Sequence, residues 1–178
     1  MKVVFLDIDG VLNTRAWVED LGRARGVAHL DPAACVRVQR LCEGSGAKLV
    51  ISSTWRFIHK RAAISDMFRA SGLTTAVVGM TTALHTMRGL EIQAWLDASP
   101  AIAEIGTVDG IVILDDDFEM EHLAPWHVKT DVDRGFTDAE LRQASEVLSR
   151  PAPIIGSARG PRDPRRSDPC AAPSRGRS

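Results

Sequence analysis

The sequence predicts an α/β fold, a doubly wound three-layer α/β/α sandwich around a mainly parallel sheet. Two observations lead to this prediction. Short apolar runs rich in Val, Ile and Leu recur along the chain, as buried parallel strands do. Helical patterns separate these runs, and polar residues follow directly after them. With 44% hydrophobic and 25% charged residues, the chain of 178 residues is typical of one globular domain.

Five short runs predict the strands of the sheet. The three clearest are Val- or Ile-rich and end directly before Asp7, Ser52 and Asp115, and they cover residues 2–6, 48–51 and 110–114. Weaker runs at 76–79 and 127–130 predict two more. Because parallel strands end at the same edge of a sheet, we expect the three polar residues to lie close together.

Helices are predicted between the strands. Asp31 and Pro32 are typical of a helix N-cap and first helical residue, and two glycines end that helix about 13 residues later. A second helix is predicted over about residues 90–97. Thr137 and Glu140 have the spacing of a capping box, which predicts the start of a third.

Charge divides the chain into two parts. We predict one domain over residues 1–149 and a flexible tail, rich in Arg and Pro, over residues 150–178. The tail holds seven of the 22 basic residues and two acidic ones, which leaves the domain with 15 basic and 21 acidic residues. An acidic domain argues against broad, non-specific binding of nucleic acid, although the basic tail can add an electrostatic contact.

Cysteine usage and hydropathy bear on the compartment. Cys35, Cys42 and Cys170 fit neither a disulfide framework nor a Cys-x-x-Cys metal site, and the first two are predicted to be buried on a helix. The first apolar run ends at Asp7, too early for a signal peptide, and no run reaches the roughly 18 residues that a membrane span needs. We therefore expect a cytoplasmic protein without a membrane partner.

Asp7 and Asp9 follow the first predicted strand with one residue between them. Both carboxylates can reach one cation there, because Gly10 lets the backbone turn sharply. The pair therefore indicates a site for a hard metal ion. On its own, an Asp-x-Asp pair fits two helix caps or a solvated turn equally well.

The wider segment from Phe5 to Asn13 resembles motif I of the haloacid dehalogenase (HAD) superfamily, an apolar strand followed by Asp-x-Asp-Gly-Thr/Val-Leu. The resemblance implies a Mg²⁺-dependent phosphatase in which Asp7 is the nucleophile and forms an aspartyl phosphate. It implies that Asp9 protonates the leaving oxygen and then activates water, and that the Ile8 carbonyl helps to hold Mg²⁺. We count the carboxylates of Asp7 and Asp9 among the candidate metal ligands.

Motif II of this superfamily is a hydroxyl residue after the next core strand. Ser52 and Ser53 both fit, and we favour Ser52 as the first polar residue after the apolar run. Serines in this position also form turns and helix N-caps. Arg56 is a candidate for a bidentate phosphate contact, or else an ordinary surface arginine.

Motif III is a basic residue at the start of the helix before the last acidic strand. Arg88 stands at that place, where many relatives carry lysine, and Lys60 and Arg61 are rivals for the role. Arg88 is expected to neutralise the phosphoryl oxygens and the nucleophile.

Motif IV is an acidic cluster after an apolar strand, and Asp115, Asp116 and Asp117 fit it. Such crowding of negative charge is unfavourable unless a cation balances it. We expect Asp116 to ligate Mg²⁺ and Asp115 to ligate it through water or to orient the site.

The intervals between motifs bear on the substrate. Between Asn13 and Lys48, only about 18 residues remain beyond the core's own helix, which is too few for a sizeable cap domain. An open site suits the phosphate of a large substrate, such as a nucleic-acid end, or a small molecule enclosed by a partner subunit. The chain resembles the small capless members associated with nucleic-acid repair, and the resemblance lies in residues 52–56, 91–96, 128–131 and 135–137. The sequence does not specify an oligomeric state.

Two other functions remain open at this point. A receiver-like phospho-acceptor module also combines aspartate, Mg²⁺, a hydroxyl and a lysine on a doubly wound sheet, but with the acceptor aspartate on its third strand. A catalytically silent binding domain with the same fold is the other possibility, although such a scaffold has no use for Asp9 beside Asp7.

Overall fold

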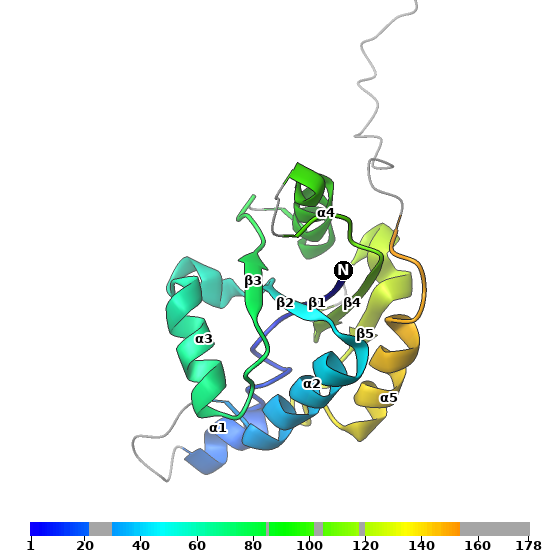
Figure 1. Ribbon diagram of the computed structural model, residues 1–178. Helices are drawn as coiled ribbons and strands as arrows, with labels where there is room; N and C mark the ends of the chain where they lie inside the picture. The colour runs from blue at the N-terminus through cyan, green and yellow to red at the C-terminus, as the bar shows by residue number, and fades with distance from the viewer. Residues whose placement is uncertain (22–29, 85, 102–104, 118–119, 154–178) are drawn as a thin grey trace, which may run out of the picture.

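A five-stranded parallel sheet forms the centre of the molecule (Figure 1). The computed structural model describes residues 1–21, 30–84, 86–101, 105–117 and 120–153. In sheet order β3-β2-β1-β4-β5, the strands are β1 (Lys2–Leu6), β2 (Lys48–Ile51), β3 (Val77–Met80), β4 (Gly110–Asp115) and β5 (His127–Lys129). All four neighbouring pairs are parallel, which confirms the predicted doubly wound α/β fold.

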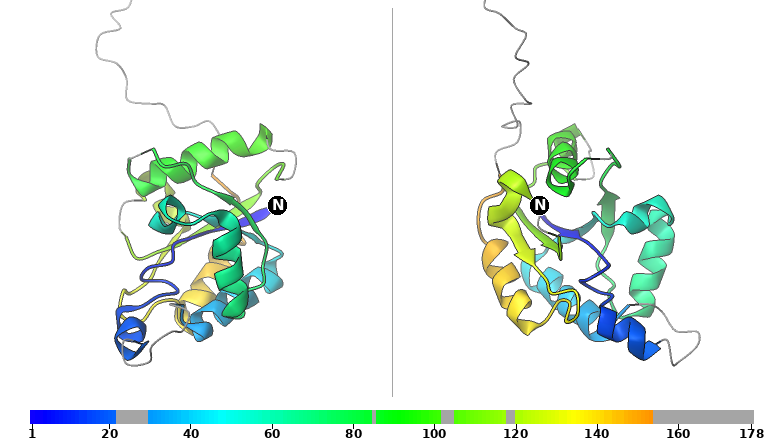
Figure 2. Two further views of the ribbon diagram at one scale, coloured as in Figure 1. Left: turned by 90° about the vertical axis from the view of Figure 1, so that its left-hand side faces the viewer. Right: turned by 180° about the vertical axis from the view of Figure 1, so that it is seen from behind.

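Helices cover both faces of this sheet (Figures 1 and 2). They are α1 (Arg15–Leu21), α2 (Pro32–Ser45), α3 (Arg61–Ala70), α4 (Arg88–Ala98) and α5 (Asp138–Val147). Short 3₁₀ helices lie at Thr54–Phe57, Ser99–Ala101 and Glu121–Trp126. Helix α4 lies over one face, and α2, α3 and α5 pack against the other. The described residues include no inserted domain.

The alternation of side chains along β1 builds two cores. Val3 and Phe5 pack on the side of α4, where the Phe5 ring meets Trp95 edge-on at 5.3 Å between ring centroids. Val4 and Leu6 pack on the opposite side. All four side chains are fully buried, as expected for a central strand covered on both faces.

The helix boundaries follow the predicted capping signals. Asp31 caps α2 by accepting a hydrogen bond from the Ala33 N–H at 2.8 Å, and Pro32 is the first helical residue. The capping box that begins at Thr137 is also confirmed. The helix predicted over 90–97 starts earlier, at Arg88, because Met87 is the extended residue before it. Arg88 therefore stands in the first turn of α4.

Cys35 and Cys42 are buried on α2, as predicted, and burial raises the pKa of each thiol to about 12. Both are therefore protonated near neutral pH and act as small hydrophobic side chains.

The chain remains attached to the core beyond α5. The Trp126 indole N–H donates to the Pro151 carbonyl at 2.9 Å, and the Ala152 N–H donates to the Asp109 carbonyl at 3.1 Å. Residues 154–178, which include most of the predicted tail, lie outside the described residues. Among the described helices, none is long and apolar enough to span a membrane.

Candidate active site

The register of the sheet brings three polar residues to one edge. Leu6 of β1 pairs with Ile51 of β2 on one side and with Leu114 of β4 on the other. The next residues along the three strands, Asp7, Ser52 and Asp115, therefore lie at the same level of the sheet. Backbone hydrogen bonds extend the pairing by one residue: the Asp7 N–H donates to the Leu114 carbonyl at 2.9 Å, and the Ser52 N–H donates to the Leu6 carbonyl at 3.1 Å. This register puts Asp7 between Ser52 and Asp115, beyond the carboxyl ends of the strands.

Three carboxylates gather at this edge. Asp7, Asp115 and Asp116 each offer an oxygen, and these oxygens lie within 4.8 Å of one another. A Cβ atom on Gly10 would lie 2.4 Å from the Asp116 carboxyl carbon, so only glycine lets Asp116 approach the loop after β1. Carboxylate oxygens are the ligands that Mg²⁺ and Ca²⁺ prefer, and the cluster is thus able to hold such an ion.

Arg88 provides the positive charge beside this cluster. Its Nη1 atom lies 3.5 Å from Asp7 Oδ2 and 3.2 Å from Asp115 Oδ2, and it also donates to the Ser52 carbonyl. Gly89 allows this position, because a Cβ there would lie 2.7 Å from the Met120 carbonyl oxygen. Of the three basic candidates, Arg88 is thus the one that the structure brings to the acidic cluster.

The two rivals of Arg88 lie elsewhere. Lys60 is the exposed N-cap residue of α3, and Arg61 donates to the Val78 carbonyl from the first turn of that helix.

The two candidate serines have different roles. Ser53 caps the 3₁₀ helix that follows, because its hydroxyl accepts from the Trp55 N–H at 3.3 Å. Ser52 is fully buried, and among the described residues its hydroxyl has no hydrogen-bond partner. A buried hydroxyl without a partner is unfavourable, so the Ser52 hydroxyl beside Asp7 is available to donate to a ligand. This contrast favours Ser52 over Ser53 as the phosphate-binding hydroxyl.

Arg56 points into the protein. Its guanidinium forms a buried ion pair with Glu91 of α4 and donates to the carbonyls of Ser52 and Ser53. The other Glu91 oxygen accepts from the Leu84 N–H at 2.9 Å. These contacts favour a role for Arg56 in holding the end of β2, rather than the phosphate contact that the sequence suggested. Sequence reasoning missed Glu91, which lies 35 residues away along the chain.

Asp9 lies outside the acidic cluster of the described residues. Its carboxylate accepts from the Trp55 indole N–H at 2.9 Å and from the Asn13 side-chain amide at 2.9 Å. Burial raises the pKa of Asp9, and the bond from Trp55 lowers it. The two bonds hold the carboxylate in one orientation next to Asp7. The contact with Trp55 was not foreseen from the sequence.

The Ile8 carbonyl does not fit its expected role as a magnesium ligand. It accepts backbone hydrogen bonds from Leu12 at 2.8 Å and Asn13 at 3.0 Å, with Val11 at 3.3 Å. These bonds turn the oxygen into the loop that follows β1, and the prediction that it helps to hold Mg²⁺ is not supported.

Comparison with known families decides the classification. A family model described as "HAD domain in Swiss Army Knife RNA repair proteins" matches residues 3–141. The chain belongs to this family of HAD domains. Comparisons with curated proteins and with solved structures gave no match. The family match covers the five strands except Lys2 and includes all the candidate site residues, and it places the chain in the HAD superfamily of hydrolases.

The order of polar residues in this HAD domain also argues against a receiver-like module. The aspartate pair follows β1, the serine follows β2 and the acidic cluster follows β4. A receiver module would carry its phosphate-accepting aspartate after the third strand, where β3 is instead followed by Thr81.

The HAD domain should show a pH-dependent stability that originates at Asp115. Burial, and after it the charge of Asp7, raises the pKa of Asp115 from its ordinary 3.8 to about 7. The folded state therefore binds this proton more tightly than the unfolded state, so stability should fall as the pH rises from about 4 to about 7 and level off above that. We expect Asp115→Asn to remove this fall.

Thermal unfolding in a metal chelator across this pH range measures the effect. The melting temperature of Asp115→Asn minus that of the unaltered protein should increase between about pH 4 and pH 7. A difference that stays constant with pH would show that Asp115 ionises normally in the folded protein.

Proposed function

We propose that this HAD domain is a magnesium-dependent phosphohydrolase that works through an aspartyl phosphate on Asp7. The observation that supports it most is the position of Asp7, which is next to Ser52 at the edge of the sheet, contacts the Arg88 guanidinium and belongs to the acidic cluster. The Asp7 carboxylate is also oriented, because its Oδ1 atom accepts from the Ile8 N–H at 2.7 Å. A fixed carboxylate beside donors for phosphoryl oxygens is the arrangement that attack on phosphorus needs.

Asp7, Asp115 and Asp116 are the residues that would hold Mg²⁺. The three carboxylates fit the ion chemically, because negative charges this close together are unfavourable without a cation. When bound, the ion neutralises charge on the phosphoryl oxygens.

The chemistry falls to four side chains. A carboxylate oxygen of Asp7 attacks phosphorus, and the bond from phosphorus to the leaving oxygen breaks as Asp9 gives that oxygen its proton. Asp9 then takes a proton from water, which attacks the aspartyl phosphate and releases inorganic phosphate and the Asp7 carboxylate. The Ser52 hydroxyl and Arg88 bind the phosphoryl oxygens in both steps.

A nucleic-acid end is the substrate that we propose. The family description names RNA repair proteins, and the described residues contain no inserted domain that would enclose a small metabolite. A silent binding domain is the alternative, and it leaves the unpaired Ser52 hydroxyl and the oriented Asp9 without a purpose.

The test is a Mg²⁺-dependent screen over an aryl phosphate, phosphorylated metabolites, phosphopeptides, and RNA and DNA oligonucleotides with 3′- or 5′-phosphates. We expect release of inorganic phosphate from oligonucleotides, lost in Asp7→Asn and retained in Asp66→Asn, a matched change at an exposed aspartate of α3. Absence of hydrolysis from every substrate would refute the proposed function.

Trp55 provides a separate prediction about Asp9. Trp55→Phe removes the N–H that holds the Asp9 carboxylate but keeps an aromatic ring at the edge of the core. Protonation of the leaving oxygen matters most when the leaving group is a poor one. We therefore expect kcat to fall about tenfold for an alkyl phosphate and much less for p-nitrophenyl phosphate. Equal losses on both substrates would show that Trp55 does not act through Asp9.

A further inference from the structure

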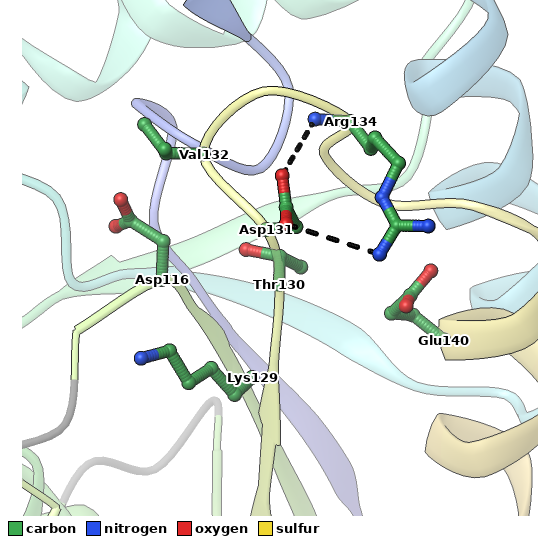
Figure 3. Close-up of a pocket in the computed structure, with 7 residues that line it drawn as sticks. All are labelled: Asp116, Lys129, Thr130, Asp131, Val132, Arg134 and Glu140. Atoms are coloured by element: carbon green, nitrogen blue, oxygen red, sulfur yellow. Dashed lines mark hydrogen bonds and ion pairs between the residues drawn. The ribbon is translucent and has the colours of Figure 1, made fainter.

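A pocket of about 500 Å³ opens next to the acidic cluster (Figure 3). Its lining comes from the end of β4, the end of β5, the following loop and the start of α5, and consists of Asp116, Lys129, Thr130, Asp131, Val132, Arg134 and Glu140. Asp116 belongs both to this pocket and to the acidic cluster. A molecule that fills the pocket would therefore lie directly beside a phosphoryl group on Asp7.

The loop between β5 and α5, residues 130–137, packs against the loop that follows β1 and begins at Asp7. The Thr130 hydroxyl donates to the Gly10 carbonyl at 2.8 Å, and the Phe136 N–H donates to the Val11 carbonyl at 3.0 Å. Gly135 permits the close approach, because a Cβ there would lie 2.7 Å from the Val11 carbonyl oxygen. These contacts hold the pocket wall against the loop that begins at Asp7.

Two of the acidic groups in the lining already serve the loop and the helix. Asp131 Oδ1 accepts from the N–H groups of Asp133 at 2.9 Å and Arg134 at 3.2 Å. Glu140 accepts from the Thr137 N–H at 2.9 Å and from its hydroxyl as part of the capping box. Their negative charge is therefore partly offset by backbone donors, and their role in the pocket is structural.

The positive charges of the lining are those of Lys129 and Arg134. Figure 3 shows the Lys129 ammonium on the side of Asp116 and the Arg134 guanidinium across the pocket, near Asp131. The Arg134 side chain is 75% exposed, and its nearest contact with Asp131 is a long one of 3.8 Å. Such an exposed pair is weak, so the guanidinium is able to turn toward a phosphate at little cost.

The position and charge of the pocket point to a substrate with a second phosphate. Arg88 and Ser52 already serve the phosphoryl group that is removed, so the two further cations in the lining of this pocket suit an anion on the leaving group. The volume lies within the roughly 300–1,000 Å³ of ordinary ligand pockets and suits one nucleotide unit. Adjacent phosphates recur along a nucleic-acid strand, whereas a singly phosphorylated peptide has none.

We propose that the pocket holds the nucleotide next to the phosphate that is removed, with Lys129 and Arg134 contacting the phosphate of that nucleotide. The inference rests on the proposed function and goes beyond it, because it names the residues that select a nucleic-acid strand. Phosphate contacts of this kind fix the register of a strand without reading its bases.

Binding to the inactive Asp7→Asn protein tests the pocket independently of turnover. The probe is a short fluorescent RNA oligonucleotide with a terminal phosphate, measured by fluorescence anisotropy with the phosphate at either end. We expect Lys129→Met and Arg134→Gln each to weaken the tighter complex about five- to tenfold and to lower its salt dependence by about one counterion. Arg142→Gln, an exposed change on α5 outside the lining, is the matched control and should leave binding unchanged.

Measurements of turnover distinguish an error in the proposed role of the pocket from an error in the proposed function. In otherwise unaltered protein, Lys129→Met and Arg134→Gln should lower kcat/KM at least five times more for the oligonucleotide than for p-nitrophenyl phosphate. Equal losses of kcat/KM on both substrates would refute the proposed role of the pocket but not the phosphatase activity. Oligonucleotide binding that both variants leave unchanged would do the same. Tighter binding of a phosphopeptide that neither variant weakens would overturn that role as well. Absence of all hydrolysis would instead refute the proposed function.

Discussion

Asp7→Asn should lower kcat for an aryl phosphate by at least about 10⁴-fold, because an amide cannot replace the carboxylate as the nucleophile. The fold should survive the change. An asparagine keeps the shape of the side chain and can still accept from the Ile8 N–H. It also removes one of the three crowded negative charges, so the melting temperature in chelator should stay the same or rise.

The measurement is steady-state phosphate release with saturating Mg²⁺, beside thermal unfolding of the same preparations. Asp66→Asn serves as the control for preparation and charge, since Asp66 is exposed and contacts only Arg69 of the same helix in the ion pairs that the described residues form. If Asp7→Asn turned over aryl phosphate within tenfold of the unaltered protein, another group would have to be the nucleophile.

Of the variants proposed here, Glu91→Gln should lower the free energy of unfolding most, by about 3–5 kcal/mol, because it leaves the buried Arg56 guanidinium without its opposite charge. Both side chains are nearly inaccessible, at 5% exposed for Arg56 and 4% for Glu91. Burial lowers the pKa of Arg56, and the charge of Glu91 is the largest influence that opposes this shift. Glutamine can still accept from the Leu84 N–H, so the loss isolates the charge.

Chemical denaturation of the single and double variants checks this interpretation. Replacing both partners with apolar residues, as in Arg56→Leu with Glu91→Leu, should cost clearly less than Glu91→Gln alone, because no uncompensated charge remains buried. If the double variant lost as much free energy of unfolding as Arg56→Leu and Glu91→Leu lose together, the pair would not act as a unit.

The fold was predictable because its signals are local. Each of the three clearest strands is a short apolar run that ends directly before a polar residue. The capping residues Asp31 and Thr137, together with a few neighbouring residues, mark the starts of two helices. Motif order predicted which strand ends meet, and the register of β1 between β2 and β4 then places Asp7 beside Ser52 and Asp115.

What the sequence could not supply are contacts between distant side chains. Arg56 has the same local surroundings whether it binds phosphate or Glu91, and only the packing of α4 against the end of β2 decides. The same holds for Trp55, because no sequence rule connects its indole to Asp9, 46 residues earlier. The choice between Ser52 and Ser53 was different, since the N-cap preference of Ser53 was visible and needed only the boundary of the 3₁₀ helix.

The most direct test of the central claim is a search for phosphate bound to Asp7. The Asp9→Asn protein, which keeps the nucleophile but lacks the base for the second step, is mixed with p-nitrophenyl phosphate and Mg²⁺, quenched in acid and examined by mass spectrometry. We predict a gain of one phosphoryl group, located on the peptide that contains Asp7 and absent from the Asp7→Asn protein. Release of phosphate at the unaltered rate, with no phosphorylated peptide, would contradict the proposed mechanism.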